Sequence, residues 1–270
     1  GTRAHPSPRR PAVLLVMVLL VPGVCCGGPR PASAEPVRVR FAEGPSHGFF
    51  TLSDATSGKK LAHGELVQWM EKRVVASRLL IRFDDGSLYD ETVRFTQRPS
   101  FRITSYELTQ KGPSFDEDQR VRFDASGRYD VRQQKHGEEE KRASGTTAIP
   151  EDTSNGLTSL LAKNLPGGAS AQAHLLTFRP EPLLLDLTVT PEGRDPYWVG
   201  GARSEATRFV VEPKVPGVKG VLATIVGREP PVVRMWIAPE PAPVLVRFEG
   251  ALYVDGPAWR MDLSAPRWTK

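Results

Sequence analysis

Alternation of apolar and polar residues is the feature that most constrains the fold of this chain. In the segment 78–83, Leu79, Ile81 and Phe83 fall on one side of an extended chain, with two arginines on the other. The segment 87–97 alternates in the same way. A period of two is typical of strands with one buried and one wet face, as in antiparallel sheets.

Turn residues between these segments predict hairpins. Asp85-Gly86 separates the two segments above and suits a tight turn that needs a positive φ. A second hairpin is expected to join 120–123 to 128–131 through the tetrapeptide 124–127, with Gly127 as its left-handed residue.

A β-bulge is predicted near Thr104 and Ser105, because the apolar side of the segment 101–110 changes between Ile103 and Tyr106. The charged run His136–Arg142 and the Ala-Ser-Gly that follows it are interpreted as a solvated loop. Further strands are expected at Leu61–Met70, Ala173–Phe178, Leu183–Val189, Thr207–Glu212, Gly220–Val226, Val232–Ile237, Val244–Tyr253 and Trp259–Leu263.

One amphipathic helix is expected at about 153–165. Asp152, Thr153 and Ser154 can cap its first amides, and Pro166 stops it. A lone amphipathic helix among many strands needs a sheet to cover. We therefore predict a mainly β fold of the α+β type, a strongly curved antiparallel sheet or open half-barrel covered by one helix, with Lys163 facing outward. The apolar stripe of the helix consists of Leu157, Leu160, Leu161 and Leu165.

The first 34 residues have the pattern of a secretion signal. Arg9-Arg10 belongs to a cationic start, Ala12–Val21 is almost wholly apolar, and Ala32-Ser33-Ala34 is a small-x-small cleavage site. The apolar run is about half of the roughly 20 residues that span a bilayer, so no permanent transmembrane anchor is expected. We predict a signal peptide at 1–34, one β-rich domain at 35–270, and a periplasmic or secreted protein.

Removal of this segment changes the composition. Four of the 36 Lys+Arg residues and none of the 31 Asp+Glu residues lie in it, which leaves 32 basic residues against 31 acidic ones. A nucleic-acid binder should carry a clustered basic patch, so nucleic acid is not an expected partner. Cys25 and Cys26 also leave with the signal, and no disulfide is expected. A lipoprotein signal at Cys25 fits less well, because Val24 stands where a small residue is normal.

The remaining chain lacks the residue spacings that mark common enzymes and metal sites. The four histidines His47, His63, His136 and His174 are not spaced for a helical zinc pair, and no GxSxG elbow marks a nucleophile. We predict no catalytic residue, metal or cofactor. A hydrolase with dispersed catalytic residues stays as a minor alternative, because such sites need no fixed spacing.

Glu91 is an unusual residue, since alternation places it between Tyr89 and Val93 on the apolar side of its strand. A buried carboxylate needs a partner or a functional reason. The favoured interpretation is that the strand lies at an edge, where Glu91 reaches water, because acids are seldom fully buried.

Three segments resemble a family of uncharacterised exported bacterial proteins: 63–115, 150–166 (PEDTSNGLTSLLAKNLP) and 244–268. The shape expected for that family is similar to that of the periplasmic lipoprotein carriers of the LolA/LolB type. Those carriers are open half-barrels with a helical lid over an apolar cavity. The resemblance implies this architecture and assigns no role to any single residue.

The function expected from these patterns is that of an exported, non-enzymatic carrier for an apolar ligand such as a lipid or acyl chain. The alternative is a cell-envelope interaction protein with a filled core, whose partner is another envelope protein. Inward-facing aromatic and leucine residues are expected in both kinds of protein, because a sheet with a cavity and a sheet with a filled core have the same alternation of apolar and polar residues. The residues expected to line a ligand cavity are Trp69, Phe95, Phe101, Leu157, Leu161 and Trp259.

Overall fold

The computed structural model describes Gly1 and residues 36–199, 202–216, 231–239, 242–253 and 255–268. The predicted signal peptide and the predicted strand Gly220–Val226 lie outside these residues. The chain from 34 onward forms one unit. No helix among the described residues is long and apolar enough to cross a membrane.

Fourteen antiparallel strands of the described chain form one sheet, made of two successive meanders. The first meander runs from β1 to β8, each strand pairing with the next. Its strands are β1 (Ser46–Asp54), β2 (Lys60–Glu71), β3 (Val74–Phe83), β4 (Leu88–Gln97), β5 (Phe101–Lys111), β6 (Glu117–Asp124), β7 (Arg128–Lys135) and β8 (Lys141–Thr146).

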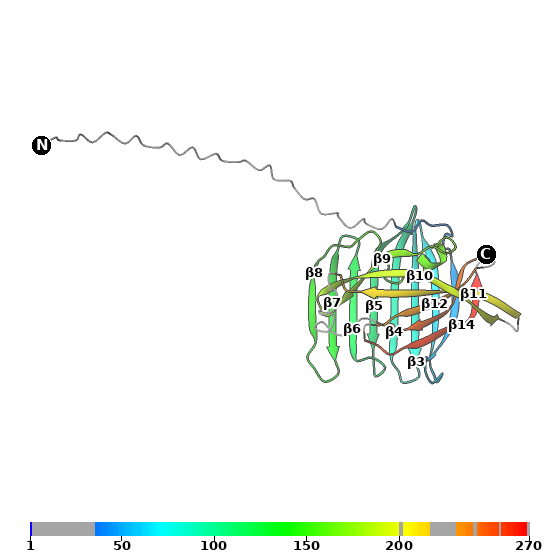
Figure 1. Ribbon diagram of the computed structural model, residues 1–270. Coiled ribbons are helices and arrows are strands. Elements are labelled where there is room, and N and C mark those ends of the chain that lie inside the picture. Colours follow the sequence, from blue (N-terminus) through cyan, green and yellow to red (C-terminus); the bar gives the residue numbers. More distant parts are fainter. Residues whose placement is uncertain (2–35, 200–201, 217–230, 240–241, 254, 269–270) are drawn as a thin grey trace. The chain divides into compact units, whose positions relative to one another are not determined.

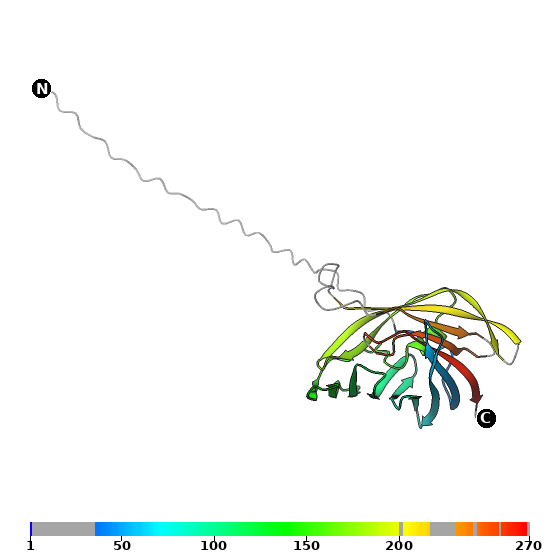
Figure 2. The same cartoon turned by 90° about the horizontal axis from the view of Figure 1, so that it is seen from below.

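The second meander runs from β9 to β14 and joins the first where β14 pairs with β1. Figure 1 shows β10 and β11 running across strands of the first meander, and Figure 2 shows that the sheet curls into two facing layers. The strands of this meander are β9 (Ala171–Phe178), β10 (Pro182–Val199), β11 (Ala202–Lys214), β12 (Val233–Ala238), β13 (Val244–Gly250) and β14 (Trp259–Trp268).

The predicted fold class is therefore confirmed: a curved, open antiparallel sheet with one short helix in the described chain. The bulge is also found where the sequence places it, since Arg94 pairs with Ser105 and Phe95 with Ile103, which skips Thr104. Gly86 and Gly127 have φ values of +88° and +84° in the two predicted hairpin turns. Residues other than glycine rarely adopt these backbone conformations.

Two strands differ from the sequence prediction. Lys141–Thr146 was interpreted as part of a solvated loop, but it forms β8, the edge strand that pairs with β7. All but one of its residues are exposed, so it carries no apolar alternation, and only backbone pairing defines it. β1 was not predicted either, although Phe50 and Leu52 of this strand are buried.

The helix α1 (Thr158–Asn164) begins five residues later than predicted. The polar residues before α1 bind β9 instead: the Asn155 side chain donates to the Leu176 carbonyl at 2.8 Å and accepts from the Leu176 amide at 2.9 Å. Ser154 donates through its amide to the His174 carbonyl. These bonds satisfy backbone groups on the outer edge of β9, so the polar residues before α1 close a sheet edge.

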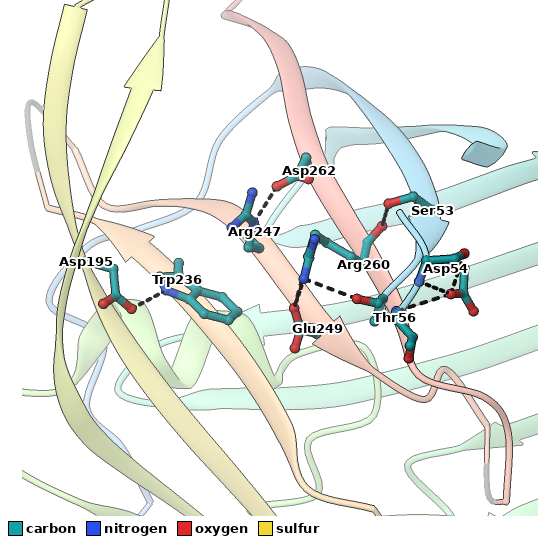
Figure 3. A network of polar contacts seen from close by, with 11 residues as sticks. Ser53, Asp54, Thr56, Asp195, Trp236, Arg247, Glu249, Arg260 and Asp262 are labelled. Carbon is teal, nitrogen blue, oxygen red and sulfur yellow. Dashed lines mark hydrogen bonds and ion pairs between the residues drawn. The ribbon is translucent and has the colours of Figure 1, made fainter. Parts of the chain in front are cut away.

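The two faces of the sheet differ as an antiparallel sheet predicts. The inner face carries the main cluster of buried apolar residues, which includes Phe95, Phe115 and Val131. The outer face of β12 to β14 carries a network of polar contacts (Figure 3), in which Arg247 Nε donates to Asp262 Oδ1 at 2.6 Å and Arg260 binds Glu249. Phe248 and Met261, next to these residues in sequence, point to the inner face.

Candidate ligand cavity

A cavity of about 260 Å³ lies between α1 and the inner face of the sheet. Strands β1 to β4 form one side of it and β12 to β14 another, so both meanders contribute to its wall. Apolar side chains make up most of this wall, among them Phe50, Leu66, Leu79, Leu160, Met235 and Phe248. From α1, Leu160 faces the cavity, which makes the helix a cover over it.

A second cavity of about 180 Å³ extends from the first toward β5, β6, β9 and β10. Its wall includes Leu108, Val121 and Leu185, so it is also largely apolar. The two cavities share a set of wall residues, and the interior is therefore hollow on both sides of one partition. The shared residues are Tyr89, Glu91, Gly156, Ala251 and Leu252.

Glu91 is the carboxylate in this partition. The Tyr106 hydroxyl donates a hydrogen bond of 2.7 Å to Glu91 Oε1, and the Tyr89 hydroxyl also binds the carboxylate. Burial raises the pKa of Glu91 above its ordinary value, and the two tyrosine hydrogen bonds oppose this rise. The edge-strand interpretation was wrong, because β4 pairs on both sides, with β3 and β5, and points Glu91 inward.

An ion pair occupies another part of the cavity wall. Lys163 Nζ lies 2.5 Å from Glu43 Oε1, and the two side chains are only 10% and 6% exposed. The segment before β1 holds this pair in place, since the Asn164 side chain accepts hydrogen bonds from the Arg40 and Phe41 amides. The expectation that Lys163 faces outward was wrong: it points into the cavity wall, where Glu43 supplies the partner that a buried cation needs.

The six residues predicted to line the cavity lie elsewhere. Phe95 and Phe101 pack edge to face with ring centroids 5.9 Å apart, and Trp259 packs on Phe83 and Phe115. Phe101, Leu157 and Leu161 border only a crevice of about 10 Å³. None of the six lines either large cavity.

Trp69 needs a further correction, because it lies on the outer face of β2. Its indole Nε1 donates to Glu71 Oε1 at 2.9 Å, in an exposed position. The inner face of β2 carries Gly64, Leu66 and Gln68 instead. Because the inner face of β2 carries a glycine and a glutamine, the apolar alternation of this strand is weak. Trp69, on the opposite face, was therefore wrongly predicted to point inward.

The histidines take part in separate pairs. His47 borders the cavity, with Nε2 3.0 Å from Glu65 Oε2, while His174 Nδ1 lies 2.6 Å from Asp152 Oδ1. Within the described ranges, no group of three or more His, Cys, Asp or Glu side chains is placed to hold a metal ion.

Comparison with known proteins shows similarity to solved structures. No family model and no curated protein matches this chain. A crystal structure of a β-barrel-like protein of the domain of unknown function DUF1849, from Brucella abortus, is similar over 87% of this chain and 100% of its own. The identity is 11% and the TM-score 0.45.

Proposed function

We propose that this protein is an exported, non-enzymatic carrier that holds an apolar ligand, such as a lipid or an acyl chain, beneath α1. The observation that supports the proposal is the apolar cavity of about 260 Å³ with a second cavity of about 180 Å³ beside it. Together they fall in the range of about 300–1,000 Å³ that is usual for small-molecule sites. Burial of acyl chains against their apolar walls supplies about 25 cal/mol per Å² of apolar surface.

Fluorescence titration with a fluorescent fatty acid tests the proposal. Leu66 and Val67 are neighbours on β2 whose side chains lie on opposite faces, and only Leu66 borders the cavity. Leu66→Trp places a larger side chain in the void, so we expect it to abolish uptake. Val67→Trp adds the same ring on the outer face and should leave uptake at the wild-type level.

Two results would contradict the proposal: a folded wild type that takes up no apolar probe, or equal uptake by the two variants. The alternative of an interaction protein would then lead. It is favoured by β8, an edge strand that pairs within the described chain with β7 only and offers its other edge to a partner.

Export is the second part of the proposal, and it rests on the pattern of the first 34 residues. We expect the exported form to begin at Glu35, which mass analysis of its N-terminal peptide would detect. An acylated terminus at Cys25 or Cys26 would make the protein a lipoprotein and overturn this part.

A further inference from the structure

A row of three glutamines crosses the inner face of the sheet at the end away from α1. Gln110 of β5 pairs with Gln119 of β6, which pairs with Gln133 of β7. Because directly opposite residues in antiparallel strands point to the same face, the three amides lie side by side. Gln110 and Gln133 are only 1% and 5% exposed, although glutamine is mostly a surface residue.

These glutamines line a cleft of about 340 Å³, separate from the apolar cavity beneath α1. The end of β9 forms its opposite wall, since Gln133 Nε2 donates to the Phe178 carbonyl at 2.8 Å. Phe178 and Tyr253 add aromatic surface to the cleft. Burial raises the pKa of Tyr253 to about 12, so its hydroxyl keeps its proton and can donate a hydrogen bond.

Two of the three amides have unused hydrogen-bonding capacity. Gln110 Nε2 donates to the Glu117 carbonyl at 3.2 Å, but Gln110 Oε1 is buried and accepts no hydrogen bond from the described chain. The Gln119 side chain is half-buried and has no hydrogen-bond partner among the described residues. A buried acceptor without a donor destabilises the fold, and a ligand that donates a hydrogen bond to it recovers part of this loss.

The charged side chains that line the cleft determine which charge of ligand it favours. Five carboxylates and three cationic side chains line it, an excess of two negative charges. Arg179 is already paired with Asp255 at 2.8 Å. An anionic ligand is therefore disfavoured, and a neutral or cationic ligand is favoured. The charged residues are Asp116, Glu117, Glu138, Glu139, Asp255, Lys135, Lys141 and Arg179.

We propose that this cleft is a saccharide site, which takes a neutral sugar or an amino sugar. Sugar hydroxyls are both donors and acceptors, as are the primary amides of Gln110 and Gln119. The parts of Phe178 and Tyr253 that line the cleft are aromatic carbon atoms, which can contact the apolar side of a sugar ring. The cleft shares no wall residue with the apolar cavity of about 260 Å³, whereas Gln119, Phe178 and Tyr253 also border the neighbouring cavity of about 180 Å³.

Nuclear magnetic resonance titration of the side-chain amides tests this proposal, with glucosamine, glucose and glucose 6-phosphate as probes. We expect saturable shifts of the Gln110 and Gln119 amide signals with glucosamine and glucose, and weaker binding of glucose 6-phosphate. Gln119→Leu should weaken sugar binding about tenfold, the equivalent of about 1.4 kcal/mol for lost hydrogen bonds. Since the Gln119 side chain makes no hydrogen bond in the described chain, this variant should fold.

The control is Arg120→Leu, which introduces the same leucine at the next residue of β6, on the exposed face. It should bind as the wild type does, and so should Leu66→Trp, whose substitution lies in the other cavity. The proposal is overturned if the wild-type amides show no saturable shift, if Gln119→Leu binds like the wild type, or if glucose 6-phosphate binds best.

Discussion

Tyr106 donates its hydroxyl proton to Glu91 across 2.7 Å, at the partition between two apolar cavities. The bond links two neighbouring strands and gives an inward carboxylate one of its partners. It also places a titratable group where an apolar ligand would lie, so the charge of Glu91 bears on both stability and binding.

The first prediction concerns pH. Because burial raises the pKa of Glu91 in the folded state, the folded state binds more protons than the unfolded state from the ordinary value of 4.5 up to the raised pKa. Stability supplied by Glu91 is therefore present at low pH and falls as the pH rises through this window. Relative to Glu91→Gln, the wild type should lose free energy of unfolding over the window and then stay level. Urea unfolding at a series of pH values measures this difference.

Tyr106→Phe provides a check on the same mechanism. The Tyr106 hydrogen bond lowers the pKa of Glu91, so its loss should move the pH dependence to higher pH. A difference between the wild type and Glu91→Gln that does not vary with pH would contradict the account.

The second prediction concerns the ion pair of Lys163 and Glu43. Lys163→Met leaves the 6% exposed Glu43 carboxylate without its partner, and we expect a loss of about 3 kcal/mol in the free energy of unfolding. Adding Glu43→Gln should recover part of this loss. As a control, Arg122→Met breaks an ion pair with Glu107 whose side chains are about half exposed, and it should cost less than about 1 kcal/mol. Equal losses for the two single variants would show that the Lys163 pair is not buried.

The third prediction tests the helix as part of the core. Leu161 is 7% exposed and borders only the small crevice, so Leu161→Ala should cost about 2–4 kcal/mol. Denaturant unfolding measures this loss. A loss below about 0.5 kcal/mol, which is typical of exposed positions, would mean that α1 does not pack against the sheet.

The fourth prediction concerns the turn before α1. Gly156 has a φ of +67°, and a Cβ there would lie 3.0 Å from Val93 Cγ1. Gly156→Ala should therefore cost about 1–3 kcal/mol in thermal unfolding. Gly167→Ala, at a position with no atom within 4 Å of the added carbon, should change stability by less than about 0.5 kcal/mol. Similar costs at both positions would argue against this turn geometry.

The sequence predicted the class of fold because alternation, turn glycines and the bulge at Thr104 are local signals. It failed where the signal is not local. β8 is defined only by its pairing with β7, and the residues before α1 bind β9, which lies about twenty positions away. The periodicity of one segment gives no information about a partner that is distant in the sequence.

The candidate site was harder to predict than the fold. Alternation shows which side of a strand is buried, but it does not show whether that side is filled or hollow. Phe95 and Phe101 fill the core, whereas Phe50 and Phe248, which are residues of the same type, border the void. The residue that best indicated the cavity in the sequence was Glu91, an acid on the apolar face of its strand.

Native mass spectrometry of the protein purified from its own cells tests the central claim most directly. The account predicts a wild-type protein that carries a non-covalent adduct, which solvent extraction identifies as a lipid or an acyl chain. The Leu66→Trp variant should lack this adduct, and the Val67→Trp variant should retain it. A folded wild type whose mass equals that of the polypeptide alone, and which gains no adduct when incubated with fatty acid, would contradict the claim.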